Sequence, residues 1–306
     1  MRHALLLLLL VSAGGPSVGQ TQPLRVFASV LPIRTFVEKV GGEHVDARAM
    51  VRPGYSPLTY DPSPQQIGAL AQAVLYVRTG VPFEDAWMER IRSVNPDMQV
   101  LDVRSGGALR EVKAHGRDDG DDGDGHGMSR QGQGHEQEAD HSVDAHYSHV
   151  WTSPPLVKQM VGVICAKLAE LDPAHAADFA RNRDAYVAEL DALDRELRAL
   201  LELLHNRKFM VFHPAWGYFA ATYGLAQVPI EREGKEPGAR ALAALIDQAK
   251  QEKVRVVFVQ PQFDKRQARQ VARAIGGSVI TVDPLAPNYT DNLREVARRF
   301  AEALQP

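Results

Sequence analysis

Apolar and polar residues alternate along this chain in two separate blocks. In each block, short continuous runs of apolar residues, many of them β-branched, alternate with segments whose apolar residues recur at helical spacing. Continuous apolar strands joined by amphipathic helices are typical of a parallel sheet covered by helices on both faces. The pattern therefore predicts an α/β fold with two parallel-sheet lobes, a first lobe over residues 24–170 and a second lobe over residues 207–306.

The individual elements follow from the same pattern. In the first lobe we expect strands at 24–31, 44–51, 73–80 and 98–103, and helices at 34–42, 62–73 and 82–94. In the second lobe we expect strands at 209–213, 226–231, 254–261 and 278–283, and helices at 215–224, 241–253, 265–276 and 292–304. Open α/β sheets bind ligands at the carboxyl ends of their strands, so a cleft between the lobes is the expected site.

Two further helices are expected, one at 152–171 at the end of the first lobe and one at 173–206 that links the lobes, and Asp172-Pro173 fits the start of the second. The apolar stripe of this longer helix consists of Phe179, Tyr186, Leu190, Leu193, Leu197, Leu200 and Leu204. The first two of these residues are seven apart, and the later ones are three or four apart. Such a stripe is also typical of a coiled-coil dimer. We favour one rigid helix that runs along both lobes of a monomer, because α/β lobes flank it and the pattern ends at Asn206.

The first 19 residues have the composition of a secretory signal peptide. Basic Arg2 and His3 precede a short leucine-rich run, and small residues follow up to Gly19. The run is shorter than the roughly 20 residues of a membrane span, and no cysteine follows that could carry a lipid. We therefore expect a soluble periplasmic protein that is neither membrane-spanning nor a lipoprotein.

Composition narrows the class of protein further. The chain has 306 residues, 44% of them hydrophobic, and a formal net charge of -3. This is enough apolar material for one large or two medium domains, and it provides no basic field for nucleic acid. The single cysteine, Cys165, cannot form an internal disulfide, and its apolar surroundings predict a small core residue.

The segment 114–146 lacks the pattern of a folded domain, because glycine and like charges disfavour a packed core. Its histidines are His115, His126, His135, His141 and His146, and aspartate and glutamate residues lie between them. Imidazole and carboxylate groups bind divalent transition metals, zinc in particular. We expect a mobile accessory loop that binds metal. The simpler alternative is a charged insertion that only keeps the protein soluble.

Three polar residues occupy positions that suit a metal site in the cleft. His213 follows one apolar strand and Asp283 follows another, which places both at carboxyl ends of strands. His149 lies where the folded pattern resumes after the loop. Two histidines and an aspartate from three segments match the ligand chemistry of zinc. Taken singly, His213 could be a buried histidine with satisfied hydrogen bonds, and Asp283 could begin a turn.

Six segments of the chain resemble one family of proteins, in that family's order. They are PGYSPLTYDPSPQQI, LYVRTGVPFEDAW, SHVWTSPPLVKQM, FHPAWGYFAATYGL, VFVQPQFDKRQA and VDPLAPNYTDNL. The chain thus resembles the zinc/manganese-type periplasmic solute-binding proteins that deliver metal to ABC importers. The resemblance covers nearly all of the chain after residue 19. It implies two α/β lobes joined by one long rigid helix, a metal ion held between them and, in many zinc members, a His-rich acidic loop.

The resemblance also implies which side chains hold the ion. The family binds its metal through four side chains from four segments, and His149, His213 and Asp283 match three of them. Histidine at position 213 resembles the zinc members more than the manganese members, and imidazole suits zinc. The fourth position departs from the family, because Leu58 stands where a histidine is usual.

Leucine cannot bind a metal, so three alternatives remain for the fourth position. The site could have three protein ligands and a water molecule. Another group could replace the histidine, either Asp61 or one of the loop residues His146 and His141, since a flexible tether costs little closure entropy. Finally, the cleft could have lost tight metal binding.

These observations predict a metal-binding protein rather than an enzyme, with Zn²⁺ favoured over Mn²⁺. The expected function is the capture of zinc between the lobes and its delivery to an ABC-type metal permease in the inner membrane. One alternative is a periplasmic zinc buffer or chaperone in which the loop is the main binder. Another is a zinc hydrolase with an open coordination position and with Asp61 or Glu231 as general base.

Overall fold

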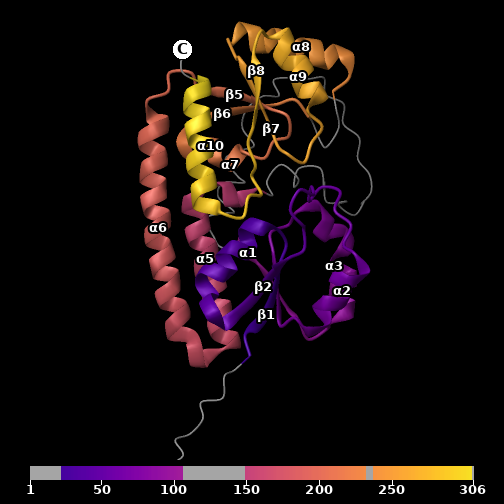
Figure 1. The fold of residues 1–306 in the computed structure, drawn as a ribbon, viewed down its shortest axis with the longest axis vertical. Coiled ribbons are helices and arrows are strands. Elements are labelled where there is room, and N and C mark those ends of the chain that lie inside the picture. The colour runs from indigo at the N-terminus through magenta and orange to yellow at the C-terminus, as the bar shows by residue number, and fades with distance from the viewer. Residues whose placement is uncertain (1–21, 106–148, 232–236, 305–306) are drawn as a thin grey trace, which may run out of the picture.

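Two parallel four-stranded sheets form the frame of the protein (Figure 1). The structure is a computed structural model that describes residues 22–105, 149–231 and 237–304. The first sheet has the order β2-β1-β3-β4 and consists of β1 (Leu24–Ala28), β2 (Val45–Ala49), β3 (Leu75–Arg78) and β4 (Gln99–Asp102). The second has the order β6-β5-β7-β8 and consists of β5 (Lys208–Val211), β6 (Ala226–Pro229), β7 (Val256–Val259) and β8 (Ser278–Thr281). The predicted pair of α/β lobes is confirmed, and both lobes have the same strand topology.

Helices cover both faces of each sheet. The first lobe contains α1 (Leu31–Gly41), α2 (Pro64–Ala69) and α3 (Pro82–Val94), together with the short 3₁₀ segments η1 (Gly42–His44), η2 (Leu70–Gln72) and η3 (Val103–Ser105). The second contains α7 (Gly217–Tyr223), α8 (Ala239–Gln251), α9 (Lys265–Ala274) and α10 (Tyr289–Leu304). Figure 1 shows α1 on one side of the first sheet and α2 and α3 on the other. Because both faces are covered, all four residues of the central strand β7 are buried, which explains the continuous apolar runs.

One long helix joins the lobes. The segment between the sheets contains η5 (Val150–Thr152), α5 (Pro154–Leu171), η6 (Pro173–His175) and the 27-residue α6 (Ala176–Glu202). Helix α6 runs along the length of the molecule and packs against α5, against α1 of the first lobe and against α10 of the second (Figure 1). Its apolar face is therefore covered within the chain, as expected for a linking helix. The finer boundaries 24–170, 173–206 and 207–306 remain predictions.

The detailed register of α6 differs from the predicted stripe. Leu201 is 0% exposed, whereas Leu200 is 36% exposed. The buried face continues from Leu197 by a step of four residues, because the packing of α6 turns Leu201 rather than Leu200 towards the larger core. The helix also ends at Glu202 rather than at Asn206.

The start of this helix differs too. Asp172 precedes η6, not α6, and its carboxylate contacts Nδ1 of His175 at 2.6 Å without capping a backbone N–H group. The prediction of an N-cap at Asp172 followed by the long helix is therefore wrong in detail, because a 3₁₀ turn intervenes.

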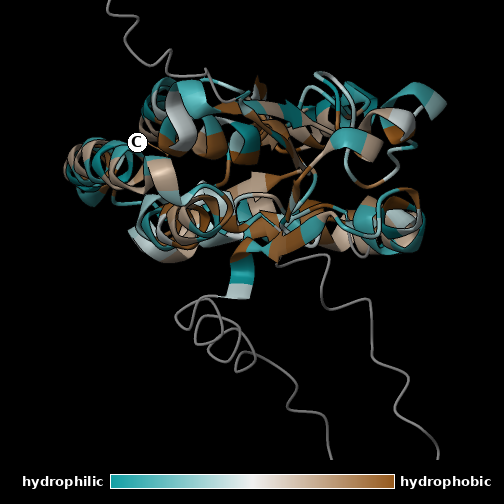
Figure 2. Ribbon diagram, turned by 90° about the horizontal axis from the view of Figure 1, so that it is seen from below, coloured by the Kyte–Doolittle hydropathy of each residue, from teal (hydrophilic) through white to brown (hydrophobic). Residues whose placement is uncertain are grey.

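Apolar residues concentrate in the strands and on the inner faces of the helices (Figure 2). One continuous core extends from the first sheet through α5 and α6 to the inner face of the second sheet, and a smaller core lies on the other face of the second sheet. Cys165 is buried in the larger core, as predicted. Among the helices of the described residues, none is long and apolar enough to cross a membrane.

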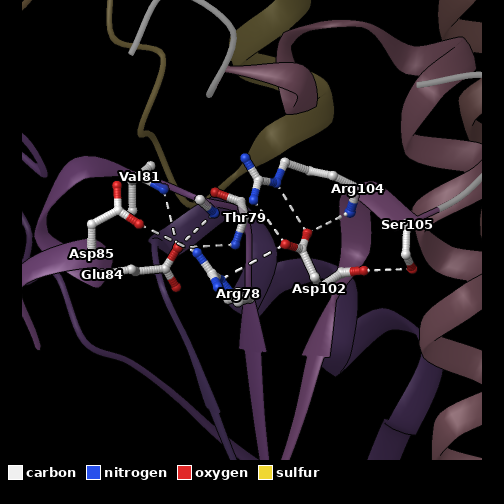
Figure 3. Close-up of polar contacts among 9 residues, drawn as sticks. Arg78, Thr79, Val81, Glu84, Asp85, Asp102, Arg104 and Ser105 are labelled. Atoms are coloured by element: carbon white, nitrogen blue, oxygen red, sulfur yellow. Dashed lines mark hydrogen bonds and ion pairs between the residues drawn. The ribbon is translucent and has the colours of Figure 1, made fainter. Parts of the chain in front are cut away.

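A buried carboxylate fixes the turn at the end of β3 (Figure 3). Oε2 of Glu84 accepts hydrogen bonds from the backbone N–H groups of Thr79, Gly80 and Val81 at 3.2, 2.6 and 3.0 Å. Gly80 has a φ of +75°, and a Cβ there would clash with the guanidinium of Arg104. The position therefore requires glycine. This turn supports the loop that contains Pro57, because the N–H of Phe83, two residues after Val81, donates to the carbonyl of Pro57 at 3.2 Å.

Candidate metal centre

Two histidines from distant parts of the chain meet in the interior. His149 immediately precedes η5, and His213 lies two residues beyond the end of β5. Their side chains are buried, with only 4% of His149 and 5% of His213 exposed. The ring centroids are 5.3 Å apart, and the ring planes make an angle of 67°. The structure therefore brings together two of the three predicted ligands.

The His213 ring is held on several sides. Phe263 stacks on its face, with centroids 5.1 Å apart and an interplanar angle of 22°. Nδ1 of His213 lies 3.4 Å from Oε2 of Glu231. The amide of Gln260 donates to the backbone carbonyl of His213 at 3.0 Å. These contacts restrict both the position of the backbone and the orientation of the ring.

His149 is fixed through the turn that it begins. Its carbonyl accepts a hydrogen bond from the hydroxyl of Thr152 at 2.9 Å. Its ring lies 5.1 Å, between centroids, from that of Trp151. The indole N–H of Trp151 in turn donates to the carbonyl of Pro284 at 2.7 Å. His149 is thus tied to the segment after β8, where the predicted ligand Asp283 lies.

Both histidines line one narrow pocket between the lobes. Its lining consists of Ser56, Pro57, Leu58, His149, His213, Gln260, Gln262, Phe263, Pro284 and Leu285. The cavity volume is about 10 Å³, which suits a single water molecule or a single ion rather than an organic ligand. Nε2 of His213 is buried and has no hydrogen-bond partner among the described residues. A buried imidazole nitrogen without a partner is available to a metal.

Asp283 lies beside this pocket rather than in it. It lines a neighbouring cavity of about 60 Å³. Its Oδ1 accepts hydrogen bonds from the side chain of Gln262 at 3.0 Å and from the N–H of Leu285 at 2.9 Å. The hydrogen bond from Leu285 shows that Asp283 begins a turn, which was the alternative interpretation of this residue from the sequence. Gln262 and Leu285 line both cavities, so the cavity of Asp283 adjoins the pocket of the histidines.

A complete ligand set is not assembled in this conformation. Within the described residues, no three histidine, cysteine, aspartate or glutamate side chains lie close enough together to hold one metal ion. The arrangement consists of two converging imidazoles with an aspartate in the next cavity.

Leu58 lines the pocket, as expected for a residue at the family's ligand position. Its loop is anchored by the contact of Pro57 with Phe83, and by the hydroxyl of Tyr60, which donates to Gln66 at 2.9 Å. Asp61, in contrast, is exposed to solvent and is not among the residues that line either cavity. The structure thus does not bring Asp61 to the histidines.

The loop histidines His115, His126, His135, His141 and His146 lie outside the described residues. Their roles therefore remain predictions.

Three neighbours of His213 were not identified as parts of the site from sequence. Gln260 and Phe263 belong to the quoted segment VFVQPQFDKRQA, and the end of β7 was the available signal for both. Glu231 follows β6, and its sequence position suggests only the general base of the alternative hydrolase. Sequence places all three near strand ends, but it does not show that they surround one ring.

Comparisons with known proteins agree with this architecture. The family described as zinc-uptake complex component A, periplasmic, matches residues 26–303. The high-affinity zinc uptake system protein ZnuA of Bacillus subtilis is 25% identical over 286 residues, which cover 90% of this chain and 82% of that protein. The zinc-binding lipoprotein AdcA of Streptococcus pneumoniae is 24% identical over 264 residues, which cover 86% of this chain and 50% of AdcA.

A solved structure of a ZnuA deletion mutant with zinc bound matches with a TM-score of 0.77 and 37% sequence identity, covering 93% of this chain and 100% of that one. Both the sequence relatives and this structural neighbour extend over the two lobes and the linking helix. The chain therefore belongs to the periplasmic zinc-uptake complex component A family.

Proposed function

We propose that this protein is the extracytoplasmic solute-binding component of an ABC importer, that it captures a zinc ion between its lobes and that it delivers the ion to a membrane permease. The observation that carries the proposal is the pair of buried imidazoles, His149 and His213, which meet in a pocket of about 10 Å³ between the lobes. Membership of a zinc-uptake family supports the same function. This is a role in binding and transport, without catalysis.

Zinc is the proposed ion because of the donor atoms. Imidazole nitrogen suits zinc, whereas manganese prefers sites rich in oxygen. Only neutral imidazole binds a metal, so protons compete with the ion, and we expect affinity to fall as the pH drops towards about 6.

Asp283 is the proposed third ligand. Its cavity adjoins the pocket, and its carboxylate belongs to the turn that also contacts Trp151 through Pro284. A small inward movement of this turn would add one carboxylate to the two imidazoles. Since Leu58 stands where the family has its fourth ligand, that coordination position would be taken by water or by a histidine from the segment before His149, such as His146 or His141.

We also propose that residues 1–19 direct export, that the periplasmic protein is soluble rather than lipid-anchored, and that it is a monomer. The covered apolar face of α6 supports a monomer, because a coiled-coil dimer would need that face exposed. The loop histidines would raise the local zinc concentration near the cleft.

Calorimetric titration with zinc tests the proposal. The protein without residues 1–19 should bind one ion tightly, and the variant with His149→Ala and His213→Ala should lose that site while it keeps weaker loop sites. A double variant that retains the tight site would overturn the cleft assignment. Deletion of residues 115–145 separates an importer component from a zinc buffer. The importer component keeps one ion per molecule, whereas a buffer loses most of its capacity.

A further inference from the structure

Glu231 is a buried carboxylate that lies within ion-pair distance of a proposed zinc ligand, His213. It lies two residues after β6, with only 4% of the residue exposed, and its backbone N–H donates to the carbonyl of Phe212 at 2.9 Å. Its Oε2 lies 3.4 Å from Nδ1 of His213. Adjacent parallel strands β5 and β6 therefore place the two side chains together at their carboxyl ends.

Burial makes this contact significant. A carboxylate removed from water is costly unless it is paired or hydrogen-bonded. Oε2 of Glu231 has no hydrogen bond among the described residues, and the imidazole of His213 is the ion-pair partner within reach. A contact of 3.4 Å is slightly longer than an ordinary N–H···O hydrogen bond, so a small adjustment would complete it.

Both nitrogens of the His213 ring are buried, and neither forms a hydrogen bond in the described part of the chain. They differ in their surroundings, because Nδ1 lies 3.4 Å from Oε2 of Glu231. The hydrogen bond at one ring nitrogen determines which nitrogen carries the proton and which one binds a metal. A carboxylate beside Nδ1 keeps the proton there and leaves Nε2 for the ion.

We propose that Glu231 is a positioning residue for zinc capture, which accepts the Nδ1–H of His213, fixes the tautomer of the ring and directs Nε2 into the pocket. The inference rests on the proposed function for its consequence in zinc binding. Glu231 itself is not among the pocket-lining residues, so it acts through His213 and not as a ligand.

The test uses two substitutions of Glu231 and one control. Glu231→Met removes the acceptor and keeps a similar size, whereas Glu231→Gln retains an acceptor oxygen without the charge. Glu252→Gln is the control, because this carboxylate of the same lobe binds Lys208, far from His213 in the sheet. Thermal unfolding shows which variants fold as the parent protein does, and only those are compared. If Glu231→Met does not fold, Glu231→Gln is used in its place.

Two readouts separate the inference from the proposed function. In the metal-free protein, the ¹⁵N chemical shifts of His213, assigned with a His213→Gln variant, should show the Nδ1–H tautomer in the parent chain and its loss in Glu231→Met. Chelator competition should show zinc affinity lowered by about 10- to 100-fold in Glu231→Met, less in Glu231→Gln, and unchanged in Glu252→Gln.

If His213 keeps the Nδ1–H tautomer in Glu231→Met, the inference is overturned, whether or not the zinc affinity falls. A fall in zinc affinity without a change of tautomer would mean that Glu231 is a ligand or a structural residue. If Glu231→Met does not fold, the decision rests on Glu231→Gln. The inference is then overturned if Glu231→Gln loses no more zinc affinity than Glu252→Gln does. Absence of tight zinc binding by the parent chain would contradict the proposed function instead, and the tautomer readout would still decide the role of Glu231.

Discussion

The imidazole rings of His149 and His213 lie with their centroids 5.3 Å apart, although α5 and the whole of α6 separate the two residues along the chain. The long helix packs against both lobes and so fixes their relative position. Trp151, two residues after His149, adds a hydrogen bond to Pro284 at 2.7 Å. The two imidazoles are thus held near each other by the fold, which reduces the entropy lost when an ion binds.

Restoring a histidine at position 58 should strengthen zinc binding. Leu58 lines the pocket with His149 and His213, and its loop is anchored at Pro57. A further imidazole would complete a tetrahedral set of protein ligands. We expect Leu58→His to raise the affinity by about tenfold or more, or about 1.4 kcal/mol, in a chelator competition assay.

The matched control is Thr59→His, which adds a histidine to the same loop. Thr59 is exposed and is not among the residues that line either cavity. Affinity in this variant should stay near the parent value. An equal gain in both variants would show that the added histidine acts outside the pocket.

Two adjacent leucines test the register of α6. Leu201 is fully buried in the larger core, whereas Leu200 is partly exposed. Truncation of a buried leucine removes apolar contacts and leaves a cavity, so Leu201→Ala should lower the free energy of unfolding by about 2–5 kcal/mol. Leu200→Ala should change it by about 0.5 kcal/mol or less. Urea denaturation measures both, and the reverse order would restore the stripe expected from sequence.

Glu84 should make the stability of the protein depend on pH. Burial raises the pKa of this carboxyl from 4.5 to about 7, against the opposing effects of Arg78 and the backbone hydrogen bonds. Between about pH 4.5 and 7 the folded protein therefore holds a proton that the unfolded chain releases. The stabilisation is fully present below pH 4.5 and is lost as the pH rises through 7, on the order of 3 kcal/mol in total.

Glu84→Gln tests this dependence, because the amide stays uncharged and its oxygen can still accept the three backbone hydrogen bonds. Urea denaturation across pH 4.5 to 8 should give a shallower fall of stability in the variant than in the parent chain. Equal slopes would mean that Glu84 titrates alike in the folded and unfolded states.

Most of the fold could be predicted from the sequence, because continuous apolar strands and amphipathic helices have distinct periods. The register of α6 could not, since Leu200 and Leu201 are both apolar and only the packing of α1, α5 and α10 decides which one is buried. The turn η6 was missed for a related reason, because Asp172-Pro173 suits a 3₁₀ turn as well as an α-helix.

The candidate site was predictable only in part. His213 and Asp283 could each be identified because each follows a predicted strand. Their separation into two neighbouring cavities depends on Gln262 and Leu285, which line both cavities, and the spacing of residues along the sequence does not predict this. The partnership of His213 with Glu231 depends on the neighbouring order of β5 and β6 in the sheet. Sequence alone does not give that order.

The most direct test of zinc capture between the lobes is a crystal structure of the protein with one equivalent of zinc, with anomalous diffraction measured at the zinc absorption edge. The proposal predicts one dominant anomalous peak with a nitrogen of His149 and Nε2 of His213 each at about 2.0–2.1 Å, and with the carboxylate of Asp283 moved to it. A dominant peak that touches neither histidine would contradict it.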